Sequence, residues 1–296
     1  MEKSKMVNRA IRSLLFTPGN HQEKVKKVFL AGADVAILDL EDAVAISQKE
    51  MTRSLVVAAL KMPRKCLGYV RINAEDTEFY EGDLTTVVGP WLDGIVLPKV
   101  ETADQLLAAD RALHDLEAAS GLKPGRIELI PIIETARGIE SVSDISGCGS
   151  RIRRISFGAV DFAKDLGMKL SLDEWELTPA RSKIVIASRI AGLEAPLDSV
   201  WVHYKDLDGL MASSQRVCDM GFRGKMCIHP DQIPIVNKVF TPSDEDVAQA
   251  QKIITAFKDA EANGSASIQI DGFFVDYPIV EQARRTLDLI KSIKGE

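Results

Sequence analysis

This chain of 296 residues lacks an excess of positive charge, a long apolar run and an apolar N-terminal segment, and each absence excludes a class of protein. Basic residues do not exceed acidic ones, and the formal net charge of −6 argues against a general nucleic-acid binder, because such proteins concentrate positive charge against phosphates. No apolar run approaches the roughly 18 residues of a membrane span. Residues 1–13 are mildly basic but lack the apolar centre of a secretory signal. We therefore expect a cytoplasmic protein that binds neither nucleic acid nor membrane.

Cysteine is also scarce and shows no metal-binding or disulfide pattern. Cys66, Cys148, Cys218 and Cys227 are scattered without a C-x-x-C pair, which is typical of reduced thiols in a cytoplasmic protein. Cys227 and His229 are two residues apart, as in a metal clip, but no second pair accompanies them. We interpret both as structural residues.

Eight short apolar segments recur along the chain and alternate with helix-type segments. They are nearly continuous in apolar residues, as expected for strands that are covered on both faces. The segments span residues 13–17, 35–40, 67–72, 94–98, 127–133, 154–158, 199–204 and 225–229. Strand–helix alternation through eight strands predicts an α/β fold, a TIM (β/α)8 barrel as the catalytic domain over residues 1–240. A doubly wound sheet is the alternative.

Residues 241–296 remain after the expected barrel. Ser243 opens a helix-type segment whose first turn is acidic, and Gly264 ends it. A short strand or turn and a second helix-type segment follow. We predict a C-terminal helical extension that acts as a lid or as an arm for oligomerisation.

Two of the predicted strands end abruptly in a carboxylate. "IPIIETARG" places Glu134 after an apolar run, and "ISFGAVD" does the same for Asp161. Catalytic groups of such barrels lie at the C-terminal ends of the strands, so the two acids should approach each other and a cation would relieve their repulsion. Two carboxylates with water or substrate oxygens suit Mg²⁺. We predict that both bind Mg²⁺; a helix N-cap is the alternative for each, although Thr135 could cap equally well beside Glu134.

Other polar side chains follow the second, third and fourth predicted strands. We assign to substrate binding Glu41, Asp42, Arg71, Pro98 and Lys99. We also assign a catalytic role to Arg71, because it is always protonated and its fork can stabilise charge on two oxygens, but it could instead pair with an acid of the barrel mouth. Asp42 and Lys99 could likewise form an ion-pair network. The residues alone therefore predict a metal-assisted barrel enzyme and no particular substrate.

Seven segments resemble, in this order and spacing, the citrate lyase β-subunit-like family, which is also described with the HpcH/HpaI aldolases. They are "RSLLFTPGN", "LDLEDAV", "VRINA", "GIVLPKVE", "IPIIETARG", "FGAVDFAKDLG" and "GFRGKMCIHPDQI". The resemblance covers essentially the whole chain. It implies Mg²⁺, a homotrimer or homohexamer, and carbon–carbon lyase activity on a CoA thioester of the citramalyl-CoA, malyl-CoA or citryl-CoA type. Its alternatives are a citrate lyase β subunit that acts on an acyl-carrier-protein thioester within a complex, and a malyl-CoA thioesterase-like hydrolase.

The resemblance also implies roles for single residues. Glu134 and Asp161 match the metal carboxylates of the family, and Arg71 matches its substrate-binding arginine. In the tail, "DGFFVDYP" places Asp276 at an aspartate that, in several relatives, enters a neighbouring subunit's site and performs acid–base catalysis. A helix N-cap is again the alternative for this residue.

Two positions depart from the pattern of the family. Many relatives have glutamate directly before the metal aspartate, where this chain has Val160. The stretch "VWVHYKD" carries His203 and Lys205 where many relatives have aspartate or arginine. Both positions are expected near the substrate, so they leave the acyl group open and leave room for thioester hydrolysis.

Overall fold

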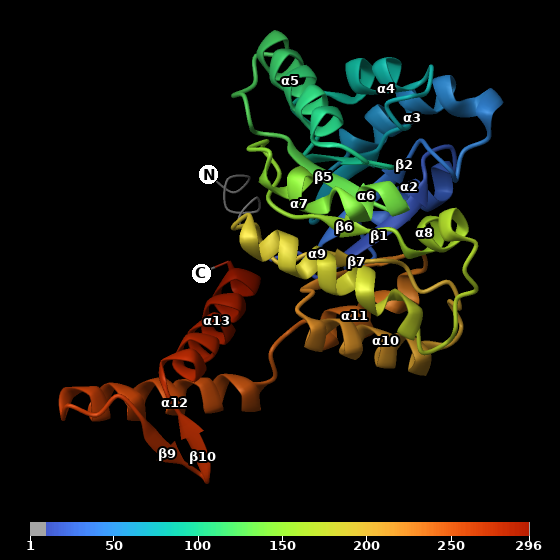
Figure 1. Cartoon of the computed structure of the whole chain (residues 1–296). Coiled ribbons are helices and arrows are strands. Elements are labelled where there is room, and N and C mark those ends of the chain that lie inside the picture. Colours follow the sequence, from blue (N-terminus) through green and yellow to red (C-terminus); the bar gives the residue numbers. More distant parts are fainter. Residues whose placement is uncertain (1–9, 296) are drawn as a thin grey trace. The chain divides into compact units, whose positions relative to one another are not determined.

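The computed structural model describes residues 10–295, and its central feature is a closed barrel of eight parallel strands (Figure 1). Each strand pairs with the next in chain order, and β1 pairs with β8 to close the barrel. The strands are β1 Ser13–Pro18, β2 Val35–Asp39, β3 Leu67–Arg71, β4 Gly94–Leu97, β5 Glu128–Ile133, β6 Ser156–Phe157, β7 Leu197–Asp198 and β8 Gly224–Cys227. The predicted α/β class and TIM barrel are confirmed.

Helices connect the strands and surround the barrel (Figure 1). In α5, Thr102 and Gln105 form a capping box, and Leu106, Ala109 and Leu113 repeat at helical spacing and are buried. The helices of the barrel region are α2 Gln22–Val28, η1 Ile46–Gln48, α3 Lys49–Leu60, α4 Tyr80–Val87, α5 Ala103–Ala119, α6 Ala136–Glu140, α7 Val142–Gly147, α8 Ala159–Leu166, η2 Trp175–Leu177, α9 Thr178–Ile190, α10 Leu207–Met220, η3 Pro230–Gln232 and α11 Ile233–Val239.

The seventh strand lies earlier in the chain than predicted. The apolar stretch 199–204 was the expected strand, whereas β7 comprises Leu197–Asp198. Asp198 is fully buried, and its carboxylate accepts a hydrogen bond from Arg181 Nε at 2.9 Å and contacts Lys225 Nζ. A charged residue can occupy this strand because two cations compensate it. A hydrophobicity pattern carries no information about such compensation, so the prediction favoured the neighbouring apolar run.

The chain divides into two compact units: a barrel unit, Arg12–Lys238, and a second unit that contains residues 10–11 and the chain from Val239 onward, here called the C-terminal unit. The C-terminal unit consists of α12 Asp244–Ala262, an antiparallel hairpin of β9 Ile268–Ile270 and β10 Phe273–Val275, and α13 Tyr277–Lys294. Ser243 caps α12, because its hydroxyl accepts the N–H of Asp246 at 3.1 Å. The predicted C-terminal helical extension is confirmed.

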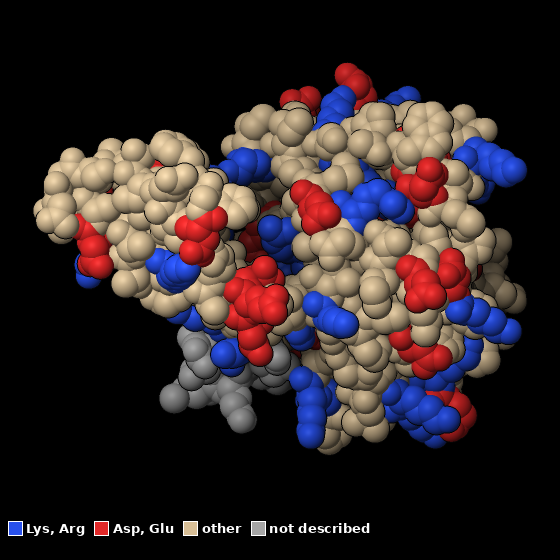
Figure 2. Space-filling view, turned by 90° about the horizontal axis from the view of Figure 1, so that it is seen from below, with Lys and Arg blue, Asp and Glu red and all other residues tan. Residues whose placement is uncertain are grey.

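The distribution of charge can be followed on one face of the molecule, and the hydropathy of the helices along the described chain. On the face shown in Figure 2, acidic and basic side chains are interspersed rather than gathered by sign. Among the described residues, no helix has both the length and the apolar character that a membrane crossing requires.

Candidate active site at the barrel mouth

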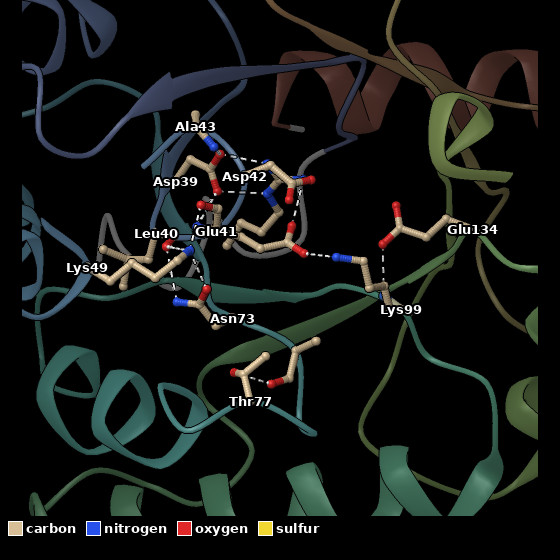
Figure 3. A network of polar contacts seen from close by, with 12 residues as sticks. Asp39, Leu40, Glu41, Asp42, Ala43, Lys49, Asn73, Thr77, Lys99 and Glu134 are labelled. Atoms are coloured by element: carbon tan, nitrogen blue, oxygen red, sulfur yellow. Dashed lines mark hydrogen bonds and ion pairs between the residues drawn. The ribbon is translucent and has the colours of Figure 1, made fainter. Parts of the chain in front are cut away.

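Glu134 directly follows β5 and is buried, with 3% of its surface exposed. Its Oε1 accepts the backbone N–H of Lys99 at 2.8 Å (Figure 3). Its Oε2 lies so close to Gly158 that a Cβ there would come within 2.3 Å of it. Thr135 is the N-cap of α6 and accepts the N–H of Gly138 at 3.0 Å. Glu134 therefore does not cap the helix, and its position requires another explanation.

Asp161 lies in the first turn of α8 and is half-buried. The N-cap of α8 is Gly158, two residues before Val160, so Asp161 does not occupy the capping position. Within residues 10–295, no donor forms a hydrogen bond with the Asp161 carboxylate. The capping alternatives for both acids are thus disfavoured, and a carboxylate without a donor remains available for a ligand.

Electrostatics link these acids to a third carboxylate, that of Glu41. Burial, followed by the negative charges of Glu41 and Asp161, raises the pKa of Glu134 from an ordinary 4.5 to about 8. A divalent cation beside Glu134 would stabilise its ionised form against these neighbouring negative charges.

The donor set fits Mg²⁺ better than a softer metal. Glu134 and Asp161 would hold the ion with carboxylate oxygens, which Mg²⁺ prefers. Across the described part of the chain, no three or more His, Cys, Asp or Glu side chains form a group that could hold a metal ion by themselves. Water or substrate oxygens would therefore complete the coordination, as is usual for Mg²⁺.

Arg71, the last residue of β3, is held by acids on two sides. Its Nε and Nη2 donate to the two carboxylate oxygens of Asp39 at 2.7 and 2.6 Å. Its Nη1 faces Glu41 Oε2 at 3.0 Å and Asp42 Oδ2 at 3.8 Å. Burial lowers the pKa of Arg71, but the charge and hydrogen bonds of Asp39, together with the charges of Glu41 and Asp42, raise it overall. Arg71 is thus permanently charged at the mouth. Its pairing with acids, the alternative to a substrate-binding role, is present, and the substrate-binding role stays a prediction.

Lys99 connects the Arg71 region to Glu134. Its ammonium contacts Glu41 Oε1 while its backbone N–H binds Glu134 (Figure 3). Burial lowers the pKa of Lys99, but the hydrogen bond and charge of Glu41, together with the charges of Asp42 and Glu134, raise it overall. For the acid Glu41, burial has the opposite effect and raises the pKa, and the positive charge of Arg71 opposes that shift. The ion-pair network expected of Lys99 is present and runs through Glu41.

A buried lysine supports the loop after β2. Lys49, the first residue of α3, donates its ammonium to the carbonyl oxygens of Leu40 and Glu41 at 3.0 and 2.7 Å and to Asn73 Oδ1 at 2.6 Å (Figure 3). Asn73 in turn donates to Asp83. This network fixes the backbone that carries Glu41.

The remaining predicted site residues lie in different settings. Asp42 is exposed beside Arg71, and Pro98 is buried directly before Lys99. Asp276 lies outside the barrel unit, at the N-cap position of α13, yet its side chain makes no capping hydrogen bond. His229 caps η3, which agrees with the structural role predicted for it.

Sequence analysis assigned no role to Asp39 or Lys49. The signal for Asp39 is its place at the end of a predicted strand beside another that ends in an arginine. Asp39 and Arg71 are partners in the register of β2 and β3, and neighbouring register partners project to the same side of a sheet. Lys49 offers no comparable signal, because a lysine at a helix start is usually solvated.

Comparison with known proteins identifies the relatives of this chain. The chain matches the family described as HpcH/HpaI aldolase/citrate lyase over residues 12–230. It belongs to this family. Citrate lyase subunit beta of Leuconostoc mesenteroides subsp. cremoris is 36% identical over 284 residues, which cover 94% of this chain and 92% of that protein. Mitochondrial citramalyl-CoA lyase of Homo sapiens is 33% identical over 299 residues, which cover 96% and 86%.

A solved structure extends the similarity of this HpcH/HpaI family member to the fold. The crystal structure of CitE from Mycobacterium tuberculosis in complex with magnesium, acetoacetate and coenzyme A has a TM-score of 0.78 and 30% sequence identity. The similarity covers 96% of this chain and 99% of that one. The family predicted from the sequence motifs is confirmed.

Proposed function

We propose that this chain is a Mg²⁺-dependent carbon–carbon lyase that cleaves a 3-hydroxyacyl-CoA thioester into acetyl-CoA and an oxo acid. The observation that carries the proposal is the buried Glu134 carboxylate, which is electrostatically coupled to Asp161 and Glu41 beside the fixed charge of Arg71. Relatives named as lyases confirm the predicted enzyme class. A neighbour solved with magnesium and coenzyme A supports the cofactor and the thioester substrate.

The reaction requires charge to be stabilised at two oxygens. The C3 hydroxyl proton passes to a water molecule as the C2–C3 bond breaks. The C3 oxygen then becomes the carbonyl oxygen of the oxo acid, and the bonding electrons form the enolate of acetyl-CoA. Mg²⁺, held by Glu134 and Asp161, would supply Lewis acidity toward substrate oxygens. Arg71 would direct N–H groups that Asp39 does not occupy toward the developing negative charge. Glu41, Asp42, Pro98 and Lys99 would line the substrate site.

Asp276 would donate the proton that converts the enolate at C2 into acetyl-CoA. Two observations support this assignment: the family match of the tail motif, and a carboxylate at the N-cap of α13 that makes no capping bond. We place this residue in the site of a neighbouring copy, within a homotrimer or homohexamer. The proposal includes a cytoplasmic location.

The decisive experiment supplies purified protein and Mg²⁺ with citramalyl-, malyl- and citryl-CoA. Acetyl-CoA and oxo acid should appear together from one of them, EDTA should abolish the reaction, and added Mg²⁺ should restore it. Glu134→Gln and Asp161→Asn should each abolish Mg²⁺ binding while the thermal melting profile is retained. Full activity in metal-free protein would contradict the proposal.

The same assay separates the two alternative activities. A thioesterase releases free CoA, which a thiol reagent detects, and forms no acetyl-CoA. A subunit that requires a carrier protein cleaves the acyl group only when it is attached to an acyl-carrier protein. Either result, without cleavage of any free CoA ester, would replace the proposed activity.

A further inference from the structure

Asp39 and Arg71 form a buried pair at the ends of two neighbouring strands. Asp39 has 1% of its side chain exposed and Arg71 has 12%. The two residues are partners in the parallel register of β2 and β3, although they are 32 positions apart in the chain. Two parallel N–H···O contacts between a guanidinium and a carboxylate constrain both the position and the plane of the arginine.

Asp39 also organises the loop that follows β2. Its Oδ1 accepts the N–H of Glu41 at 3.0 Å, and its Oδ2 accepts the N–H of Ala43 at 3.1 Å (Figure 3). Four donors therefore converge on two oxygens, which leaves this carboxylate little capacity to bind a ligand of its own. One side chain thus fixes both Arg71 and the backbone of Glu41.

The two hydrogen bonds to Asp39 determine which N–H groups of the Arg71 guanidinium remain available to bind a substrate. A guanidinium carries five N–H groups, and Asp39 occupies one on Nε and one on Nη2. The two N–H groups on Nη1 lie on the side of the guanidinium where Nη1 forms ion pairs with Glu41 Oε2 at 3.0 Å and Asp42 Oδ2 at 3.8 Å. The Phe16 ring lies 4.8 Å from the guanidinium carbon, which restricts the group further.

We propose that Asp39 is a positioning residue, which holds Arg71 so that its Nη1 group is presented to the substrate and which sets Glu41 through the same carboxylate. The kinetic consequence, a lower kcat of thioester cleavage when Asp39 is replaced, rests on the proposed function. The structural consequence, a guanidinium locked by Asp39, is independent of that function.

The opposite end of β2 offers a matched control. Asp34, immediately before β2, accepts hydrogen bonds from Arg12 Nε at 2.9 Å and Arg12 Nη2 at 2.8 Å. The Asp34 side chain is 8% exposed and that of Arg12 is 13% exposed, so the pair resembles Asp39 and Arg71 in chemistry and burial. Because it lies at the other end of the strand, its loss should cost stability without affecting the mouth.

The structural consequence is tested by chemical modification without any substrate. Phenylglyoxal modifies accessible guanidinium groups, and mass spectrometry of peptides measures the rate at each arginine. Asp39→Asn should accelerate modification of Arg71, because the amide nitrogen replaces an oxygen that accepts two of the four donors, one of them from Arg71. Asp34→Asn should accelerate modification of Arg12 and leave Arg71 unchanged. An Arg71 rate that is equal in wild type and Asp39→Asn, or equally raised by Asp34→Asn, would overturn the proposal.

The kinetic consequence is tested in thioester cleavage. Asp39→Asn should lower kcat by about 10²-fold, as expected when a group at the reacting centre is misplaced by about 1 Å, with a smaller change in KM. On an Arg71→Lys background the same substitution should cause little further loss, because the two residues act as one unit. Two results would contradict positioning through Arg71. One is a double variant whose loss of kcat equals the sum of the two single losses in free energy; the other is a kcat of Asp39→Asn as high as that of Asp34→Asn.

Two controls keep these results interpretable. If Asp39→Asn does not fold, Asp39→Glu retains the charge but lengthens the side chain, and it should likewise accelerate modification of Arg71. If wild-type protein cleaves no thioester, the proposed function fails while the modification rates still decide whether Asp39 locks Arg71.

Discussion

Lys99 donates its backbone N–H to Glu134 Oε1 at 2.8 Å from a left-handed conformation with φ of 52°. For a residue with a Cβ, this conformation costs about 1–2 kcal/mol. Such strain persists where the surrounding structure requires it, commonly at functional sites. Here it lets one residue direct its N–H toward Glu134 and its ammonium toward Glu41.

Substitution of Lys99 should therefore separate stability from activity. Lys99→Gly and Lys99→Ala both remove the ammonium, and both should lower kcat/KM. Glycine tolerates positive φ, so the glycine variant should be more stable than the alanine variant by about 1 kcal/mol. Chemical denaturation measures this difference. Equal stability of the two variants would show that the strained conformation is absent in solution.

The pH dependence of the metal-free protein should report on Glu134. Its pKa is raised to about 8 in the folded chain, so between about pH 4.5 and about pH 8 the folded state holds a proton that the unfolded state has lost. The contribution of this group to stability is therefore complete below about pH 4.5 and lost as the pH rises through about 8. Melting temperatures in EDTA should show this fall, and Glu134→Gln should remove it.

Mg²⁺ binding should release a proton for the same reason. Below about pH 8 the metal must displace the Glu134 proton, so about one proton should leave per ion bound. Calorimetry in buffers of different ionisation enthalpy measures this number, and affinity should increase with pH across the range. Binding without proton release at neutral pH would contradict a Glu134 that is protonated in the metal-free protein and binds the metal.

Gly158 should be required for the metal site. A methyl group there would lie 2.3 Å from Glu134 Oε2 and 2.6 Å from its Cβ, so Gly158→Ala must displace the carboxylate. We expect a loss of Mg²⁺ affinity of about 10-fold or more, as for other changes that misorient ligands. Gly147→Ala is the control. Apart from the neighbouring residues and the backbone of its own helix, no atom lies within 4 Å of a Cβ at Gly147. Normal Mg²⁺ affinity in Gly158→Ala would exclude the proposed Glu134 geometry.

Asp276→Asn should separate catalysis from capping. Asparagine caps nearly as well as aspartate, and the Asp276 side chain makes no capping bond, so the melting temperature and Mg²⁺ affinity should hold. As a proton donor asparagine fails, and kcat should fall by at least about 10²-fold. A near-normal kcat would remove Asp276 from the mechanism.

Mixed oligomers then test whether Asp276 acts across subunits. Inactive Asp276→Asn chains and inactive Glu134→Gln chains, unfolded together and refolded, should recover part of the activity, since some sites would combine intact groups from both. Each variant refolded alone is the control. A strictly monomeric mass in a fully active preparation would contradict a shared site.

Local sequence predicted the strand–helix alternation and most of the strands, and the family resemblance helped to favour a barrel over a doubly wound sheet. Buried parallel strands require nearly continuous apolar runs, and a run such as 127–133 is readable without its neighbours. The seventh strand was misplaced because Asp198 is stabilised by Arg181 and Lys225, and no short window contains all three. Residue types at the strand ends were readable in the same way, which is why Glu134 and Asp161 could be singled out.

The sequence by itself determined which chemical groups this protein has at the ends of its strands: carboxylates suited to a hard cation and an arginine that stays charged. Only the tertiary structure decided which of these groups are available to a ligand and which hold other side chains in place. Asp39 and Glu41 are two residues apart and chemically similar, yet the register of β2 and β3 joins Asp39 to Arg71, while Lys99 holds Glu41. The physical reason is that hydrogen bonds and ion pairs between distant strands depend on register and closure of the barrel, which no local pattern of residues contains.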